Sequence, residues 1–246
     1  MDRRLCLPAL VGVLALCTLQ PAVADEPKSA ALMQTLPADG AWVTYNVTVK
    51  VNEQEFAMTA SARSVGQTQH GGKNCRFIEY EQQVVDASPA FSVPQLGNLT
   101  WRLLVPEEEF GEGQDPLSKA VKTWVKFDDR EPETVENVQT KDPIFAILFQ
   151  GPRKNLKFEE AKEKVVWQRG ELECSVVSGQ NDLEIGIVKL NMTQRVLRHR
   201  DVPFGVSGMQ QNLKASFGGQ AEEVVIHVSL QDHGKDAKAK LPDLVP

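Results

Sequence analysis

Residues 42–51 read Trp-Val-Thr-Tyr-Asn-Val-Thr-Val-Lys-Val, and this segment decides the fold. Every second residue is apolar, which is the period of a β-strand with one buried face. The apolar set is Val43, Tyr45, Val47, Val49 and Val51. Residues 54–65 and 75–85 continue the pattern after short polar turns, so the sequence predicts a three-stranded antiparallel meander. Small residues such as Ala60 and Ala62 follow Phe56 and Met58 in the second strand, which predicts space beneath one end of the sheet.

Further strands are predicted along the rest of the chain. Alternating segments lie at residues 99–105, 165–177, 185–192, 196–199, 206–217 and 224–230. Gly170 supplies the turn of the hairpin at 165–177. Residues 158–164 fit either a short polar helix or an exposed loop.

Residues 106–151 carry helix start signals. Pro106 precedes three glutamates, and Asp115-Pro116 and Asp142-Pro143 each pair an N-cap residue with proline. We expect an amphipathic helix after Pro116, although residues 121–127 also suit a strand. Residues 144–149 are apolar on every side, which predicts a helix that either plugs the core or covers a ligand cavity.

The predicted fold class is mainly β (α+β). We expect a curved antiparallel sheet or incomplete barrel of about nine or ten strands, with short helices from the middle of the chain covering its concave face. The expected organisation is a signal peptide (1–24), a leader or short helix (25–41), a single β-rich domain (42–233) and a loose C-terminal tail (234–246).

The N-terminus has the pattern of a secretory signal peptide. Arg3 and Arg4 precede an apolar run, which closes on Ala22-Val23-Ala24. Lipid attachment at Cys17 needs a small residue where Leu16 stands, so we expect a soluble exported protein, either periplasmic or extracellular. No other apolar run approaches the roughly 20 residues of a membrane helix. The net charge of −6 argues against nucleic-acid or anionic-membrane partners.

Cys75 and Cys174 are the two cysteines left after signal cleavage. In an oxidising compartment the simplest interpretation of an isolated pair is a disulfide, which would join the two ends of the β-rich domain. No histidine lies at metal-ligand spacing from either cysteine, so no metal and no cofactor is expected.

Familiar catalytic motifs are not found in the sequence. It lacks a nucleophile elbow, a phosphate loop, a His-Glu-His zinc helix and a Cys-x-x-Cys pair. His199-Arg200-Asp201 is the most polar cluster near a strand end, and the structural alternative for it is a surface turn. We therefore expect a protein that is not an enzyme.

Two short motifs carry a resemblance. Gly170-Glu171-Leu172-Glu173-Cys174 is followed by Asp201-Val202-Pro203-Phe204-Gly205-Val206. This order resembles uncharacterised exported bacterial domains that are similar to the periplasmic lipoprotein-carrier fold. The resemblance implies a curved sheet around an apolar hollow, capped by the middle helices. It implies no specific function, because one fold hosts many functions.

Three hypotheses follow for the function. The first is a binding module that holds an apolar small molecule or lipid in the hollow. Its candidate lining residues are Phe56, Met58, Trp101, Trp124, Phe145 and Phe149. The second is a structural or protein-interaction domain of the cell envelope whose hollow is filled by its own side chains. The third and weakest is a hydrolase of envelope polymers.

Overall fold

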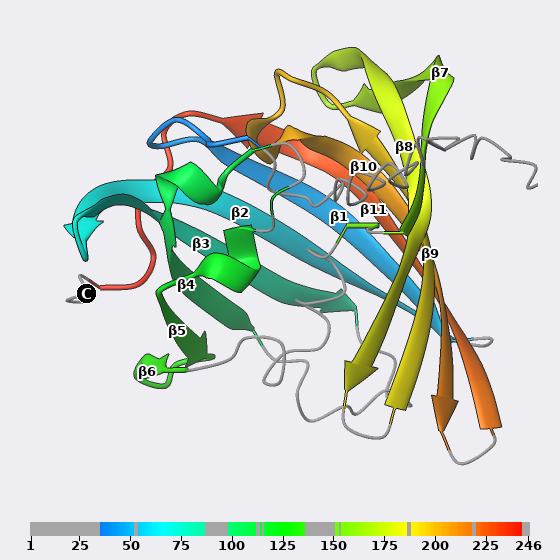
Figure 1. Ribbon diagram of the computed structural model, residues 1–246, viewed down its shortest axis with the longest axis horizontal. Coiled ribbons are helices and arrows are strands. Elements are labelled where there is room, and N and C mark those ends of the chain that lie inside the picture. Colours follow the sequence, from blue (N-terminus) through cyan, green and yellow to red (C-terminus); the bar gives the residue numbers. More distant parts are fainter. Residues whose placement is uncertain are drawn as a thin grey trace, which may run out of the picture.

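The structure is a computed structural model (Figure 1). In it, the alternating residues 42–51 form the central strand of one large sheet. The structure describes residues 35–51, 54–86, 98–111, 114, 116–135, 151–152, 154–185, 188–217 and 220–242. Among these residues, no helix is long enough and apolar enough to pass through a lipid bilayer.

Within the described ranges, the sheet has eleven antiparallel strands in the order β6-β5-β4-β3-β2-β1-β11-β10-β9-β8-β7. The strands of the first half are β1 (Trp42–Val51), β2 (Gln54–His70), β3 (Lys73–Asp86), β4 (Leu99–Pro106), β5 (Lys122–Phe127) and β6 (Glu133–Thr134). Those of the second half are β7 (Lys154–Trp167), β8 (Gly170–Ile185), β9 (Val188–Arg198), β10 (Val206–Phe217) and β11 (Gln220–Gly234). The described helical segments are three short 3-10 turns, η1 (Glu107–Glu109), η2 (Pro116–Lys119) and η3 (Pro203–Gly205).

The two halves of the chain meet at the first and last strands. β1 pairs with β11 along its whole length, for example Val47 with Val228 and Val49 with Ile226. Each half is a meander that runs outward from or inward to this seam, so the sheet is open and ends at β6 and β7. The sheet is strongly twisted. In Figure 1, β8 and β9 run at a steep angle to β3 and β4.

The apolar side chains of β1 define one face, which we call the core face. Tyr45, Val47 and Val49 belong to the main core cluster and are at most 5% exposed. Cross-strand partners share a face, so the cluster extends through Met58 on one side and Met209 on the other. The opposite side, which carries Asn46, is called the outer face.

The helix starts expected at Pro106 and Pro116 are confirmed, but only as the short 3-10 turns η1 and η2. After the single turn of η2, residues 122–127 form β5, which is the strand alternative for this segment. Residues 158–164 belong to β7 and form neither a helix nor a loop. The helix expected at residues 144–149 lies outside the described residues. The predicted mainly β fold with an unclosed antiparallel sheet is confirmed, and the eleven strands among the described residues exceed the expected total of about nine or ten by one or two.

The prediction of a loose C-terminal tail is wrong for residues 235–242. Asp236 Oδ1 accepts a hydrogen bond from Trp42 Nε1 at 2.8 Å, and the Ala237 amide donates to the Gly40 carbonyl at 2.9 Å. Leu241 is 3% exposed. The segment is therefore held on the outer face.

A buried ion pair receives the end of this tail. Glu79 is 0% exposed and accepts two hydrogen bonds from Arg102, which is itself buried. The backbone amides of Lys240 and Leu241 donate to the same carboxylate at 2.8 and 2.9 Å. Arg102 donates in turn to the carbonyls of Leu241 and Pro242. The tail thus supplies hydrogen bonds that a buried charge pair requires.

Candidate functional site

The residues predicted to line an apolar hollow are distributed over both faces. Phe56, Met58 and Trp101 lie together in the core cluster and are 5%, 2% and 0% exposed. Trp124 pairs with Arg102 and belongs to a separate outer-face cluster with Cys75 and Leu104, so it does not lie with the other three. Phe145 and Phe149 lie outside the described residues.

The predicted disulfide is wrong, because Cys75 and Cys174 are both free and buried. Cys75 lies on β3 and Cys174 on β8, with β2, β1, β11, β10 and β9 between them. Six strand spacings amount to about 29 Å along the sheet, far beyond the separation that a disulfide can bridge. Cys174 Sγ lies 2.9 Å from Ser207 Oγ instead, and burial raises the pKa of both thiols. The β1–β11 pairing joins the two halves in place of a sulfur bridge.

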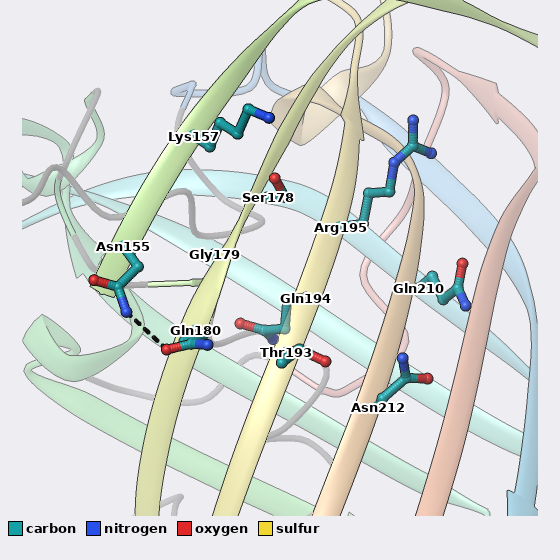
Figure 2. Close-up of a pocket in the computed structure, with 10 residues that line it drawn as sticks. All are labelled: Asn155, Lys157, Ser178, Gly179, Gln180, Thr193, Gln194, Arg195, Gln210 and Asn212. Atoms are coloured by element: carbon teal, nitrogen blue, oxygen red, sulfur yellow. Dashed lines mark hydrogen bonds between the residues drawn. The ribbon is translucent and has the colours of Figure 1, made fainter.

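A polar groove crosses strands β7 to β10, and its volume is about 440 Å³ (Figure 2). Its lining consists of amide, hydroxyl and cationic side chains together with one glycine. The lining residues are Asn155, Lys157, Ser178, Gly179, Gln180, Thr193, Gln194, Arg195, Gln210 and Asn212. We call this feature the amide groove.

Two rows of paired residues build the floor of the amide groove. Ser178 pairs with Arg195, which pairs with Gln210 on the next strand. In the adjacent row, Gln180 pairs with Thr193 and Thr193 with Asn212. Because cross-strand partners point to the same side, both rows project from the outer face.

An irregularity in β7 shapes the outer edge of the groove. The register between β7 and β8 shifts between Lys154 and Lys157, and Asn155 has a left-handed backbone with φ 52°. Asparagine tolerates this conformation better than most residues, and bulges redirect side chains. The side chain of Asn155 donates from Nδ2 to Gln180 Oε1 at 2.7 Å, which Figure 2 marks with a dashed line.

Position 179 in β8 requires glycine, because neighbouring atoms pack closely against it. A Cβ atom at this position would lie 2.8 Å from Pro152 Cβ and 2.9 Å from the Lys154 carbonyl oxygen. Pro152 is buried, so it has little room to move. The absence of a side chain therefore lets the start of β7 lie against β8.

The two cations of the groove, Arg195 and Lys157, differ in their acidic partners. Arg195 Nη2 lies 2.6 Å from Glu163 Oε2 and 3.4 Å from Glu159 Oε2, and these hydrogen-bonded carboxylates raise the pKa of Arg195. Lys157 is exposed at the outer edge. Arg195 is thus already engaged by acids from β7.

The lining determines what chemistry this site can perform. Each amide offers two N–H donors and a carbonyl acceptor, and each hydroxyl both donates and accepts. The lining residues include no carboxylate, imidazole or thiol that could transfer a proton near neutral pH. In the part of the chain that the structure describes, no group of three metal-ligating side chains occurs. The groove is therefore equipped for hydrogen bonding to a polar ligand, with the positive charge of Lys157 at its outer edge.

Sequence reasoning missed the amide groove. Its residues lie on predicted strands, but polar residues on alternate positions look like an ordinary solvated face. Residue type could have indicated the groove. The side chains of Gln180, Thr193, Gln210 and Asn212 are uncharged, in a chain that is rich in Lys and Glu. Only the strand register shows that they lie side by side.

Comparisons with known proteins add little to this geometry. No known protein family matches the chain, and no curated protein matches it. One similar solved structure is described as a candidate exported protein with a YmcC-like fold from Bacteroides fragilis. It is 9% identical with a TM-score of 0.39, over 82% of this chain and 99% of that chain.

Another similar solved structure is a DUF1329 family protein from Desulfovibrio piger. It is 8% identical with a TM-score of 0.33, over 78% of this chain and 84% of that chain. Likenesses this distant carry no argument about fold or function. The resemblance to the lipoprotein-carrier fold therefore remains a prediction.

Proposed function

We propose that this protein is an exported, non-enzymatic binding module of the cell envelope, and that its amide groove binds a polyhydroxylated ligand of the glycan class. One observation carries the proposal: amide and hydroxyl side chains from four neighbouring strands converge on one groove. Export is part of the proposal and is supported by the signal-peptide pattern that ends at Ala22-Val23-Ala24.

The physical reason for a glycan is the match between donors and acceptors. A sugar hydroxyl donates one hydrogen bond and accepts others, and an amide side chain can satisfy both roles. Side chains on paired strands are held by the sheet, so little order has to be gained on binding. The volume of about 440 Å³ lies in the range of small-ligand sites.

The apolar ligand or lipid is the second candidate, and the core face is where it would bind. Phe56, Met58 and Trp101 supply the aromatic and thioether surface that such a ligand needs. They are at most 5% exposed, so a ligand could reach them only if that face opened. This burial favours an interaction module with a self-filled core over a lipid carrier.

A glycan array tests the proposal with the full mature chain. We expect selective binding of one class of neutral polysaccharide, and we expect the triple variant Gln180→Ala, Gln210→Ala and Asn212→Ala to lose it. A matched control replaces three exposed amides on β1 and β2, namely Asn46, Gln67 and Gln69, with alanine and keeps the binding. Equal binding by the groove variant contradicts the proposal.

Lipid extraction from the same preparation addresses the second candidate. Protein purified from its own host is expected to release no stoichiometric lipid. Recovery of one lipid per chain would move the binding site to the core face.

A further inference from the structure

A second pocket, of about 690 Å³, lies where four distant segments meet. Its walls come from residues 35–38, the β7–β8 turn at Arg169, the β9–β10 connection at residues 200–204, and the end of β11 at residues 233–235. We call it the junction pocket. It does not overlap the amide groove in lining residues.

The β9–β10 connection is held in an unusual conformation. Phe204 has φ 68° and ψ −3°, a left-handed backbone that is rare for a bulky residue, and it is 2% exposed in the core. The His199 amide donates to the Gly205 carbonyl at 3.2 Å, and the Gly205 amide donates to the Val202 carbonyl at 2.9 Å. Strain of this kind persists only where the surrounding structure imposes it, and it is common at ligand sites.

The consequence is a fixed platform at the mouth of the pocket. Tyr45 Oη donates to the Val206 carbonyl at 2.9 Å and ties the end of the connection to the central strand. The buried side chains of Val202 and Phe204 anchor the connection from below. Arg200 and Asp201 therefore project from a rigid loop.

Positive charge gathers around this mouth. Arg169, Arg200 and Lys235 line the pocket from three different segments, whereas Asp201 is the one carboxylate in the lining. Asp232 pairs with Arg169, so the cations exceed the carboxylates of the lining and of its ion pairs by one, in a chain whose net charge is −6. Such a cluster favours an anion.

The three cations have different degrees of freedom. The Arg169 guanidinium lies 2.5 Å from Asp232 Oδ1 and 5.6 Å from the centre of the Trp167 ring, which fixes it in place. Arg200 reaches its nearest carboxylate, Asp201, only at 3.7 Å, too far for a hydrogen bond. Lys235 is exposed. Arg200 and Lys235 therefore have donors to offer a ligand.

The wall below the cations is apolar. Leu36 is 40% exposed and Pro203 is half-buried, so both present apolar surface to a ligand, above the buried Val202 and Phe204. His233 stacks on Trp167 with ring centroids 4.6 Å apart, and burial together with Arg169 lowers the pKa of its imidazole. His233 is therefore neutral at pH 7 and adds aromatic surface to this wall.

We propose that the junction pocket binds an anionic amphiphile, whose carboxylate or phosphate head group lies between Arg200 and Lys235 and whose short apolar chain lies against Leu36 and Pro203. Arg is suited to planar or tetrahedral oxyanions because its donors are arranged in a fork. This site is independent of the glycan proposal, since it shares no residue with the amide groove.

Calorimetric titration of the mature chain with octyl phosphate tests the proposal. We expect saturable binding at one site per chain and an affinity at least tenfold lower in the double variant Arg200→Gln and Lys235→Gln. Both side chains are exposed, so the variant is expected to fold. The matched control is Lys154→Gln with Lys164→Gln on β7, which removes the same charge elsewhere and leaves the affinity unchanged.

Three further probes separate the head group from the chain. Inorganic phosphate and octanol are expected to bind at least tenfold more weakly than octyl phosphate. A series of shorter alkyl phosphates is expected to lose about fourfold in affinity for each methylene removed from the apolar wall. Absence of octyl phosphate binding, equal binding by the double variant, or equal affinity for inorganic phosphate or octanol would overturn the proposal.

Discussion

The two ends of the sheet use the outer face in opposite ways. At β3 and β4 this face is sealed, because the tail covers Glu79 and Arg102 and its backbone satisfies their hydrogen bonds. At β8 to β10 the same face presents Gln180, Gln210 and Asn212 to solvent, at exposed or half-buried positions. Polar groups thus serve internal pairing at one end and remain available for a ligand at the other. This contrast locates the candidate binding surface in the second half of the chain.

The largest expected loss of stability comes from a substitution at the sealed end of the sheet. Glu79→Ala removes one partner of a buried ion pair and leaves Arg102 charged beneath the tail. We expect a loss of about 3–5 kcal/mol in the free energy of unfolding, because an uncompensated buried charge is costly. Urea unfolding followed by tryptophan fluorescence measures it.

The control for this change lies at the other end of the sheet. Glu160 on β7 is exposed, so Glu160→Ala is expected to alter the free energy of unfolding by no more than about 0.5 kcal/mol. If the two alanine variants lose similar stability, the distinction between a sealed and an open end is wrong.

A smaller effect is expected at the packed base of the amide groove. Gly179→Ala places a Cβ atom 2.9 Å from the Lys154 carbonyl oxygen, which forces β7 away from β8. We expect a destabilisation of about 1–3 kcal/mol, in the range of overpacked sites. At Gly111 the nearest atom to a Cβ is the Gln114 side chain at 3.6 Å, so Gly111→Ala serves as the control. Equal stability of the two variants would show that β7 does not rest on Gly179.

Acid is expected to loosen the sealed end gradually. Burial raises the pKa of Glu81, but hydrogen bonds from Lys240 and Arg63 outweigh it and leave the pKa below its ordinary value. A carboxyl whose pKa is lowered by folding contributes stability above about pH 5, and this contribution is lost as the pH falls through the folded pKa. The stability difference between the wild type and Glu81→Gln should therefore shrink from pH 6 to pH 3. A difference that stays constant over this range would contradict the role of the carboxylate.

The smallest effect on stability is expected in the amide groove itself. The triple variant Gln180→Ala, Gln210→Ala and Asn212→Ala removes side chains that face solvent, so each change should cost within about 0.5 kcal/mol. The same urea unfolding experiment measures the sum. A loss of several kcal/mol would mean that these amides support the fold, which would remove the basis for assigning them to a ligand.

The sequence predicted the strands in which one face is clearly apolar. Residues 42–51 alternate cleanly, and β1 forms there. The alternation fails at residues 122–127, because Trp124 and Val125 are both buried, on opposite faces. Trp124 is buried in an outer-face cluster, so apolar residues occupy successive positions of β5. The resulting apolar pattern also fits an amphipathic helix. The prediction for residues 158–164 was wrong for the opposite reason, since this edge strand carries charged residues on both faces.

Features that depend on tertiary placement could not be predicted. A count of two cysteines suggested a bridge, but only the strand order shows that β3 and β8 are separated by five strands. The tail contains lysines and prolines that are typical of loose termini, and its position depends on Glu79, which lies about 160 residues earlier in the chain. The amide groove likewise exists only once the register between β8, β9 and β10 is known.

Hydrogen–deuterium exchange with the strongest glycan of the array tests the central contrast most directly. The account predicts that bound glycan slows amide exchange at residues 178–180, 193–195 and 210–212, and leaves exchange at residues 75–82 and 99–106 unchanged. Slowed exchange at β3 and β4, or no change in β8 to β10, would contradict the assignment of the binding surface to the open end of the sheet.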